Sequence, residues 1–309
     1  MPLHPQAQAV CDLANSTSVP VAPEDRVRLT REGWGLYLAM TAGDPQPVHA
    51  VEDRDANGVP VRVYRPTAGA NLPILVVFHG GGWVIGSAEQ YDPIARWFAN
   101  ASGAVVVSVD YRLAPEHPYP APLDDCWTAL RWAAAHASEI GGDASRIAVG
   151  GDSAGGNLAA VCALLARDAG GPALALQALV YPVADVDFGT ASYIANGDGY
   201  LLDLDQMQWF FDCYTTGHVD PADWHVSPLR APDLSGVAPA VVITAEYDPL
   251  RDEGKAYADR LRDAGVAVEY RCFEGMIHSF FGLAAYDAAR DAMELVGTEL
   301  RRAFGTLDL

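Results

Sequence analysis

Short apolar runs alternate with longer amphipathic segments along most of the chain. Six runs have the length and the β-branched content of buried strands: 74–78, 104–109, 146–150, 176–181, 240–244 and 266–272. Helical patterns separate these runs, and such alternation favours a mostly parallel sheet covered by helices on both faces. Upstream, segments 48–52 and 61–64 flank a strong turn signal at 55–58, which predicts a hairpin. The pattern therefore predicts an α/β fold with an eight-stranded sheet.

Helical patterns are also expected towards both ends of the chain, over residues 6–15, 25–42 and 286–304. In the second of these, Trp34, Leu36, Tyr37 and Met40 form an apolar stripe at helical spacing. Most of that stripe is expected to pack against the rest of the protein, because an apolar helix face normally covers a core.

One connection is far longer than the others. About sixty residues separate the strand that ends at Tyr181 from the strand that begins near Val241, whereas ordinary connections are short. The insertion is rich in aromatic residues: Tyr193, Tyr200, Trp209, Phe210, Phe211, Tyr214 and Trp224. Two interpretations stay open for each of them: the side chain lines a cleft above the sheet, or it only packs the insertion onto the core.

The sequence Gly151-Asp152-Ser153-Ala154-Gly155 directly follows an apolar strand and precedes a helix-forming segment. This context is typical of a nucleophile elbow, a tight turn that projects a serine hydroxyl above the sheet. Glycine at both ends removes the Cβ atoms that would collide where strand and helix approach each other. The N–H group of Ala154 would then lie at a helix N-terminus, where it can stabilise a developing negative charge.

A second motif lies upstream, where the strand run 74–78 is followed by His79-Gly80-Gly81-Gly82-Trp83. Consecutive glycines allow backbone N–H groups to turn towards a ligand. An acyl-transfer enzyme needs such donors, because its tetrahedral intermediate carries an oxyanion beside the nucleophile. Paired with the serine turn, this segment is predicted to be an oxyanion loop and not a plain flexible turn.

Two further residues follow later strands in the order that an α/β-hydrolase requires. Asp248 comes after the strand run at 240–244, and His278 comes after the run at 266–272. His278 is predicted to take the proton of Ser153, and Asp248 to orient and stabilise the imidazole. Composition alone leaves Asp252 as a second candidate for the acid; Asp248 is preferred because it lies nearest the strand end, before Pro249. Asp252 and Glu253 are then expected to be first-turn helix charges.

Five segments together resemble the hormone-sensitive-lipase-like family of bacterial carboxylesterases. They are 79–83, 110–116, 151–156, 248–254 and 278–280, in the family's order. The resemblance implies an α/β-hydrolase fold in which Ser153 is the nucleophile, Asp248 the acid and His278 the base. It also implies oxyanion donors at the N–H groups of Gly81, Gly82 and Ala154, with Gly80 shaping the loop.

The same resemblance implies a helical cap and a division of the chain. Residues 1–45 and 183–228 would form the cap, and residues 46–182 and 229–309 the two parts of the hydrolase core. Physically, such a cap would exclude water from the oxyanion and supply an apolar cleft for acyl or alcohol groups.

The function expected on these grounds is serine carboxylesterase activity on short- to medium-chain acyl esters, through an acyl-enzyme intermediate. Two alternatives remain: an amidase or deacetylase that uses the same three residues, and a non-catalytic ligand-binding member of the fold. The second is disfavoured because such relatives are expected to have lost the base, and His278 is present. A dehydratase or lyase is a minor further option.

Three charged or ring-bearing residues near these motifs are given structural roles. His79 is expected to brace the glycine loop, and Arg112 and Glu116 to form an internal ion pair or loop brace. The glycine-rich segment 150–156 lacks the Lys-Ser/Thr of a phosphate-binding loop, so no nucleotide and no other cofactor is expected.

Composition and charge limit the classes of partner that are expected. A net charge of −20 disfavours nucleic acid and anionic membrane surfaces, so a small-molecule ester is the expected partner. The five cysteines are scattered without a metal-ligand spacing. Residues 1–16 lack the basic start and apolar core of a signal peptide, so a cytoplasmic location is expected. An exposed edge at the last strands leaves a homodimer open.

Overall fold

An eight-stranded sheet organises the protein in the computed structural model, which describes residues 2–17 and 22–307. The strands lie in the order β1-β2-β4-β3-β5-β6-β7-β8. In chain order they are β1 (Ala50–Asp55), β2 (Pro60–Arg65), β3 (Leu72–Phe78), β4 (Val105–Val109), β5 (Gly142–Asp152), β6 (Leu174–Val180), β7 (Ala240–Tyr247) and β8 (Val268–Ile277). β2 runs antiparallel to its neighbours β1 and β4, and every other neighbouring pair is parallel. The predicted α/β class and mostly parallel sheet are confirmed.

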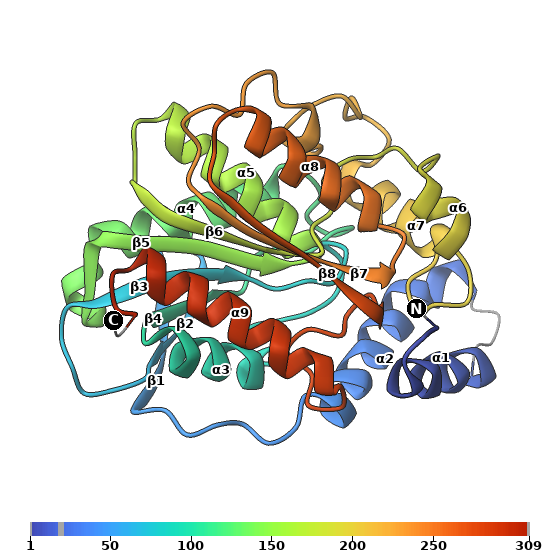
Figure 1. Cartoon of the computed structure of the whole chain (residues 1–309), viewed down its shortest axis with the longest axis horizontal. Helices are drawn as coiled ribbons and strands as arrows, with labels where there is room; N and C mark the ends of the chain where they lie inside the picture. Colours follow the sequence, from blue (N-terminus) through green and yellow to red (C-terminus); the bar gives the residue numbers. More distant parts are fainter. Residues whose placement is uncertain (1, 18–21, 308–309) are drawn as a thin grey trace.

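Helices cover both faces of this sheet. The α-helices are α1 (Pro5–Thr17), α2 (Arg26–Thr41), α3 (Asp92–Ser102), α4 (Ala121–Ala135), α5 (Ala154–Asp168), α6 (Ala191–Asn196), α7 (Leu204–Thr215), α8 (Arg251–Asp263) and α9 (Asp287–Ala303). Short 3₁₀ helices occupy Pro23–Asp25, Ala137–Ile140 and Pro228–Arg230. α3 and α9 pack together on one face, and α4, α5 and α8 lie on the other (Figure 1).

The alternation of side chains along each strand divides the core into two layers. In β3, Ile74, Val76 and Phe78 belong to the layer beneath α4 and α5, whereas Leu75 and Val77 belong to the layer beneath α3 and α9. All five side chains are buried. A shift of β3 by one residue would exchange these two sets of side chains. Because both faces of the sheet are apolar here, the hydrophobic pattern alone does not fix the register, and the neighbouring strands and the turns must contribute.

The elements found match the expected ones in type, but their ends differ. The predicted hairpin is β1 and β2, and each predicted run lies in or overlaps a strand; β5 and β8 are longer than predicted because they continue through polar residues. The expectation for the apolar stripe of α2 was wrong for half of its members. Leu36 is 66% exposed and Met40 is 72% exposed, because α2 turns Leu38 and Thr41 inwards instead.

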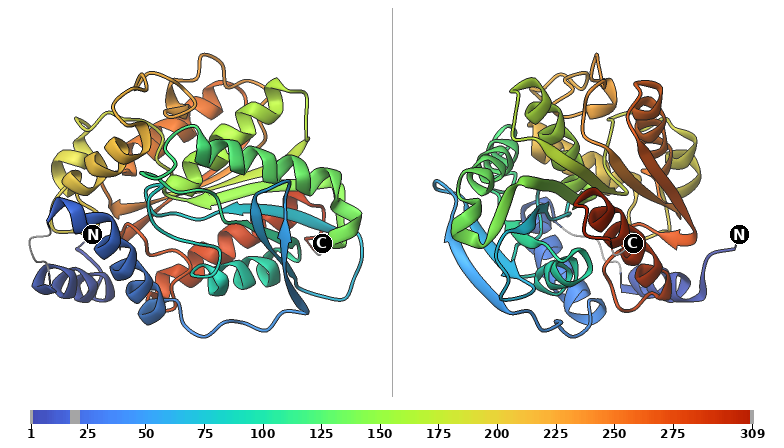
Figure 2. Two further views of the ribbon diagram at one scale, coloured as in Figure 1. Left: turned by 180° about the vertical axis from the view of Figure 1, so that it is seen from behind. Right: turned by 60° about the vertical axis from the view of Figure 1, so that its left-hand side comes forward.

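Four helices gather at the end of the sheet where the parallel strands have their carboxyl ends. α1 and α2 lie beside α6 and α7 there, as the turned view in Figure 2 also shows. They are the helices of the two segments that the sequence assigns to a cap, and the bounds 1–45 and 183–228 of those segments stay predictions. Across residues 2–17 and 22–307, no helix combines the length and the apolar character that a membrane crossing requires.

The turn between β5 and α5 presses directly against the end of β3. A Cβ atom added at Gly151 would overlap the backbone of Gly155, and one added at Gly155 would overlap the carbonyl oxygen of Phe78. Since all of these neighbours are backbone atoms, they cannot move aside as a flexible side chain could. Both glycines are therefore required by the packing of the turn.

We expect Gly155→Ala to lower the free energy of unfolding by about 2 kcal/mol or more, because the new methyl group overpacks rigid backbone. Gly33→Ala is the matched control: Gly33 is exposed on α2 and has open space around its missing Cβ, so it should be neutral or stabilising by up to about 1 kcal/mol. Urea unfolding of both variants provides the measurement. Equal stability of the two variants would contradict the packing argument.

Candidate active site

Ser153 lies in the tight turn between β5 and α5. Its backbone has φ 55° and ψ −120°, a costly conformation for a residue with a side chain. Hydrogen bonds on both sides hold the turn: the N–H of Ser153 donates to the Val180 carbonyl at 2.9 Å, and its carbonyl accepts from the Asn157 N–H at 3.0 Å. The surrounding sheet and helix therefore impose the strained geometry that the sequence motif predicts.

The structure brings the three predicted polar side chains into one hydrogen-bonded line. Ser153 follows β5, Asp248 follows β7 and His278 follows β8. His278 Nε2 lies 3.0 Å from Ser153 Oγ, and His278 Nδ1 lies 2.7 Å from Asp248 Oδ2. A carboxylate can only accept, so Nδ1 carries the ring proton and Nε2 is left to accept the serine hydroxyl. All three side chains are buried.

The geometry also separates the two candidate acids. Asp248 bonds His278 with one oxygen and accepts the Leu250 N–H with the other, at 2.8 Å. Asp252 accepts instead from the backbone N–H of Ser192, at 2.8 Å. Only Asp248 is thus in contact with the imidazole.

The expectation that Asp252 and Glu253 are simply first-turn helix charges was incomplete. Both lie in the first turn of α8. Glu253 is buried and accepts the N–H groups of Ala184 and Asp185 at 2.8 and 3.4 Å, and this burial raises the pKa of its carboxyl well above the ordinary value. Both carboxyl groups therefore bind the segment that follows β6, a partnership that helix position alone could not reveal.

The glycine loop after β3 faces Ser153. Gly81 and Gly82 line the same cleft as Ser153 and His278, and both have positive φ, 114° and 57°. Among the residues that the structure describes, none accepts a hydrogen bond from the N–H groups of Gly81, Gly82 or Ala154. Three unpaired donors at the predicted positions are what the binding of an anionic oxygen requires.

His79 supports this loop from below. Its Nδ1 lies 2.8 Å from the Gly80 carbonyl, which can only accept, so Nδ1 is protonated. The ring stacks on Tyr111 with a centroid distance of 4.2 Å, and burial lowers the pKa of His79 from its ordinary value. A neutral, hydrogen-bonded ring beneath the loop fits the bracing role that the sequence predicts.

Side chains of α7 cover the loop from the opposite side. The ring of Phe210 lies so close to Gly82 that a Cβ there would collide with it. Trp83 stacks in parallel on Tyr214, with ring centroids 4.3 Å apart and an interplanar angle of 2°. Phe210, Phe211 and Tyr214 are buried. Of the two interpretations of the aromatic residues, packing therefore holds for Phe211 and Tyr214, whereas Phe210 also lines the cleft.

Of the two roles expected for Arg112 and Glu116, the ion pair between them was wrong, because each residue binds a different partner, and these contacts fit the loop brace instead. Arg112 makes a two-point contact with Asp125 of α4, at 2.7 and 2.9 Å. Glu116 makes one with Arg31 of α2, at 2.7 and 2.8 Å. Arg31 also donates to the Val84 carbonyl at 2.9 Å, so α2 is tied to the glycine loop. Sequence reasoning gave Arg31 no role, since its partners lie far along the chain.

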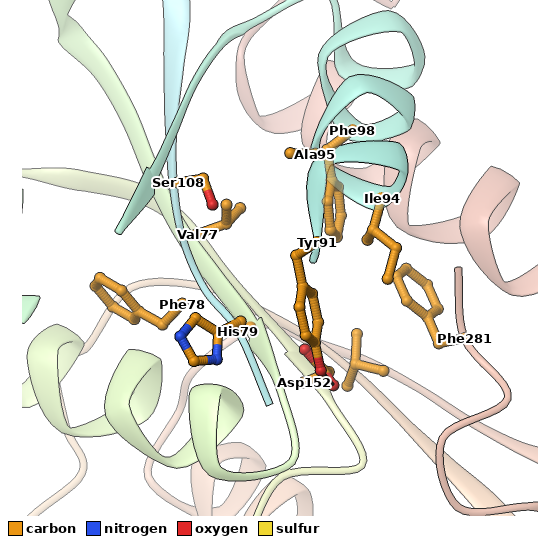
Figure 3. A pocket seen from close by; sticks show the side chains of 12 residues that line it. Val77, Phe78, His79, Tyr91, Ile94, Ala95, Phe98, Ser108, Asp152 and Phe281 are labelled. Atoms are coloured by element: carbon orange, nitrogen blue, oxygen red, sulfur yellow. Dashed lines mark hydrogen bonds between the residues drawn. The ribbon is translucent and has the colours of Figure 1, made fainter. Parts of the chain in front are cut away.

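Asp152, inside the serine motif, is a second residue to which the sequence gave no role. Its Oδ1 accepts the Gly80 N–H at 2.9 Å, and its Oδ2 accepts the Tyr91 hydroxyl at 3.3 Å. Figure 3 shows Tyr91 reaching Asp152 at the wall of a small internal cavity, with His79 nearby. Burial raises the pKa of Asp152 to about 6. One carboxylate therefore links the strand end that carries Ser153 to the loop that carries the N–H donors.

The cleft above Ser153 is mainly apolar. Residues from α2, α7 and the loop before α7 line it: Trp34, Leu201, Leu202, Gln206, Met207 and Phe210. Its floor holds the polar atoms of Ser153, His278 and the glycine loop. A small-molecule site of this kind fixes a polar group at its floor and accommodates apolar groups above it.

Comparisons with known proteins find the α/β-hydrolase fold and esterases. The family described as alpha/beta hydrolase fold matches residues 75–282. The chain is 49% identical over 251 residues to carboxylesterase NlhH of Mycobacterium tuberculosis, covering 79% of this chain and 78% of that protein. It is 40% identical over 247 residues to an arylesterase of Saccharolobus solfataricus, covering 80% of each. It resembles the hyperthermophilic esterase of Pyrobaculum calidifontis with a TM-score of 0.91 and 40% identity, over 98% of this chain and 99% of that one.

We expect Asp152→Asn to change how stability depends on pH. Because the pKa of Asp152 in the folded protein is raised to about 6 from 3.8, the folded state binds more protons than the unfolded state between these values. The wild type should therefore lose stability relative to the variant as the pH rises through this window, by about 2 kcal/mol. Urea unfolding of both proteins at pH 4.5 and 7.5 measures this, and a pH-independent difference would contradict it.

Proposed function

The chain belongs to the hormone-sensitive-lipase-like family of α/β-hydrolases and is a carboxylic ester hydrolase, and from this we propose that it cleaves short- to medium-chain acyl esters by acyl transfer to Ser153. His278 acts as the base and Asp248 as the acid. The N–H groups of Gly81, Gly82 and Ala154 form the oxyanion hole. One observation carries the proposal: the unbroken hydrogen-bonded line from Asp248 through His278 to a serine held in a strained turn.

The first half of the reaction forms the acyl-enzyme. Ser153 Oγ attacks the ester carbonyl while His278 Nε2, 3.0 Å away, takes the hydroxyl proton. The carbonyl oxygen becomes an oxyanion, and the unpaired N–H groups at the cleft floor stabilise it. The carbon–oxygen bond to the alcohol then breaks, and His278 returns the proton to the departing alcohol oxygen.

The second half releases the acid. Water takes the place of the alcohol, and His278 removes one of its protons as the water oxygen attacks the acyl carbon. When the second tetrahedral intermediate collapses, Ser153 leaves with the proton from His278. Throughout both halves Asp248 accepts the hydrogen bond from Nδ1 and stabilises the imidazolium.

The enclosure of the cleft supports a limited acyl chain length, and its apolar lining supports hydrocarbon groups in general. Phe210, Met207 and Leu202 are buried side chains of α7 and the loop before it, and they enclose the space above Ser153. The cleft is apolar, which favours hydrocarbon groups over charged ones. The same three catalytic groups could also cleave an amide, provided that the leaving amine is protonated, and the assay below includes that case.

We expect wild-type protein to hydrolyse p-nitrophenyl esters, with kcat/KM highest within the acetate-to-octanoate part of a series that extends to palmitate. Ser153→Ala should remove nearly all of this activity, because the nucleophile is lost. A matched p-nitroanilide series distinguishes an amidase. Turnover that survives in Ser153→Ala, or turnover of anilides alone, would contradict the proposed esterase mechanism.

Asp248→Asn should lower kcat by about 10⁴-fold, because an asparagine amide no longer holds the imidazole in the required tautomer. The control is Asp252→Asn, four residues further on, which leaves the contact with His278 intact and should cost less than about tenfold. Steady-state kinetics on the best ester compares the two. A larger loss of kcat in the Asp252 variant than in the Asp248 variant would show that Asp252, and not Asp248, is the acid.

A further inference from the structure

The short helix α6 is bonded side-on to the loop that carries Asp248. α6 (Ala191–Asn196) belongs to the long insertion between β6 and β7. The loop of Asp248 (248–250) joins β7 to α8, and the contacts of α6 reach from the last residues of β7 to the first turn of α8, over residues 246–252. Two side chains of α6 make the connection, Ser192 and Asn196, and both are buried. The mechanism proposed above assigns neither of them a task.

Ser192 forms three hydrogen bonds with the far end of this loop. Its hydroxyl donates to the Pro249 carbonyl at 2.6 Å and accepts the Asp252 N–H at 3.2 Å. Its backbone N–H donates to the Asp252 carboxylate at 2.8 Å. Because Ser192 is fully buried, water cannot take over these bonds if the helix shifts.

Asn196 bonds the near end, next to the acid itself. Its side-chain amide Nδ2 donates to the carbonyl oxygens of Glu246 and Asp248, at 3.2 and 3.3 Å. The side chain is 5% exposed. The Asp248 backbone is therefore held from one side by Asn196, while its carboxylate is held from the other by Leu250 N–H and His278.

The helix that carries these residues is itself well anchored. The Thr190 hydroxyl caps it by accepting the Tyr193 N–H at 3.3 Å, and the Tyr193 ring packs edge-on against Phe188 at 5.3 Å between centroids. Tyr193 is buried, whereas Ile194, on the side of the helix away from Ser192 and Asn196, is 80% exposed. α6 therefore presents a fixed polar face to the loop and an exposed apolar residue to solvent.

We infer that Ser192 and Asn196 are positioning residues for the catalytic acid: they hold the backbone of Asp248 so that its carboxylate meets His278 Nδ1. The expected effect of these residues on catalysis rests on the proposed function. Displacing a catalytic group by a fraction of an ångström to 1 Å costs rate without loss of substrate binding. The insertion is then part of the support of the active site as well as a cover over it.

Other ionisable groups surround the Asp248–His278 pair: Asp152, Tyr181, Tyr193, Glu253 and Cys272. Substitutions at Ser192 or Asn196 remove none of them and add no charge. A change in proton binding at His278 in such variants therefore reports the position of Asp248.

The test compares Asn196→Leu, which keeps the number and branching of the side-chain heavy atoms but removes the donor, with Ile194→Asn, an exposed change on the same helix. Asn196→Leu should lower kcat by about tenfold and leave KM within about twofold, because binding groups are untouched. A histidine that loses contact with its carboxylate binds its proton less tightly. The acidic limb of the kcat/KM profile should therefore move to lower pH. Ile194→Asn should change none of these quantities.

Ser192→Ala is the milder second variant, because it keeps the backbone bond to Asp252 and removes only the hydroxyl; it should show the same pattern with a smaller loss. A readout on the resting protein needs no substrate: the low-field proton NMR signal of His278 Nδ1–H, assigned by its absence in His278→Ala. In Asn196→Leu this signal should move upfield or broaden.

The outcomes separate this inference from the proposed function. Unchanged kcat, pH profile and low-field signal in folded Asn196→Leu and Ser192→Ala would overturn the positioning role, as would losses matched by Ile194→Asn. If the wild type hydrolyses no ester through Ser153, the proposed function fails, and the NMR comparison still decides whether α6 holds Asp248 against His278.

Discussion

The site depends on the close backbone contact between the turn at Ser153 and the end of β3. Gly151 and Gly155 have no room for a side chain, because the backbone of each lies against neighbouring backbone. This contact forces Ser153 into a strained conformation and aims its hydroxyl out of the sheet. It also places the loop after β3 beside the first turn of α5, so that the N–H groups of Gly81, Gly82 and Ala154 and the serine hydroxyl share one location. Without that contact, the serine hydroxyl and the N–H groups would lie on separate strand ends.

Buried and half-buried carboxyl groups around this location each accept a hydrogen bond from a backbone N–H group. Asp152 accepts from Gly80, Asp248 from Leu250, and Glu253 from Ala184. In a chain of net charge −20, cations are scarce, and the two arginines that brace nearby loops already bind Asp125 and Glu116. Hydrogen bonds from fixed N–H groups offset part of the cost of burial. They also hold each carboxyl in one orientation, and this is what makes Asp152 and Asp248 useful as links between loops.

The helices above the sheet contact both halves of the site. Arg31 of α2 binds the Val84 carbonyl, and α7 places Phe210 on Gly82 and Tyr214 on Trp83, so the glycine loop is clamped from above. α6 binds the loop of Asp248. α2 and α7 therefore line the cleft and also restrain the glycine loop, whereas α6 restrains the loop of Asp248. A shift of the covering helices would alter the geometry at Ser153 as well as access to it.

The sequence by itself determined the strands, their alternation with helices, and the order in which Ser153, Asp248 and His278 follow strand ends. These features are local: side-chain periodicity, glycine in tight turns and a motif at each strand end are all contained in short segments. Only the tertiary structure decided that Arg112 pairs with Asp125 and Glu116 with Arg31, that Leu36 and Met40 face solvent, and that Asn196 meets Asp248. Such partners lie up to 85 residues apart. They meet through the way helices dock on the sheet, and that docking depends on the packing of the whole core, which no short segment encodes.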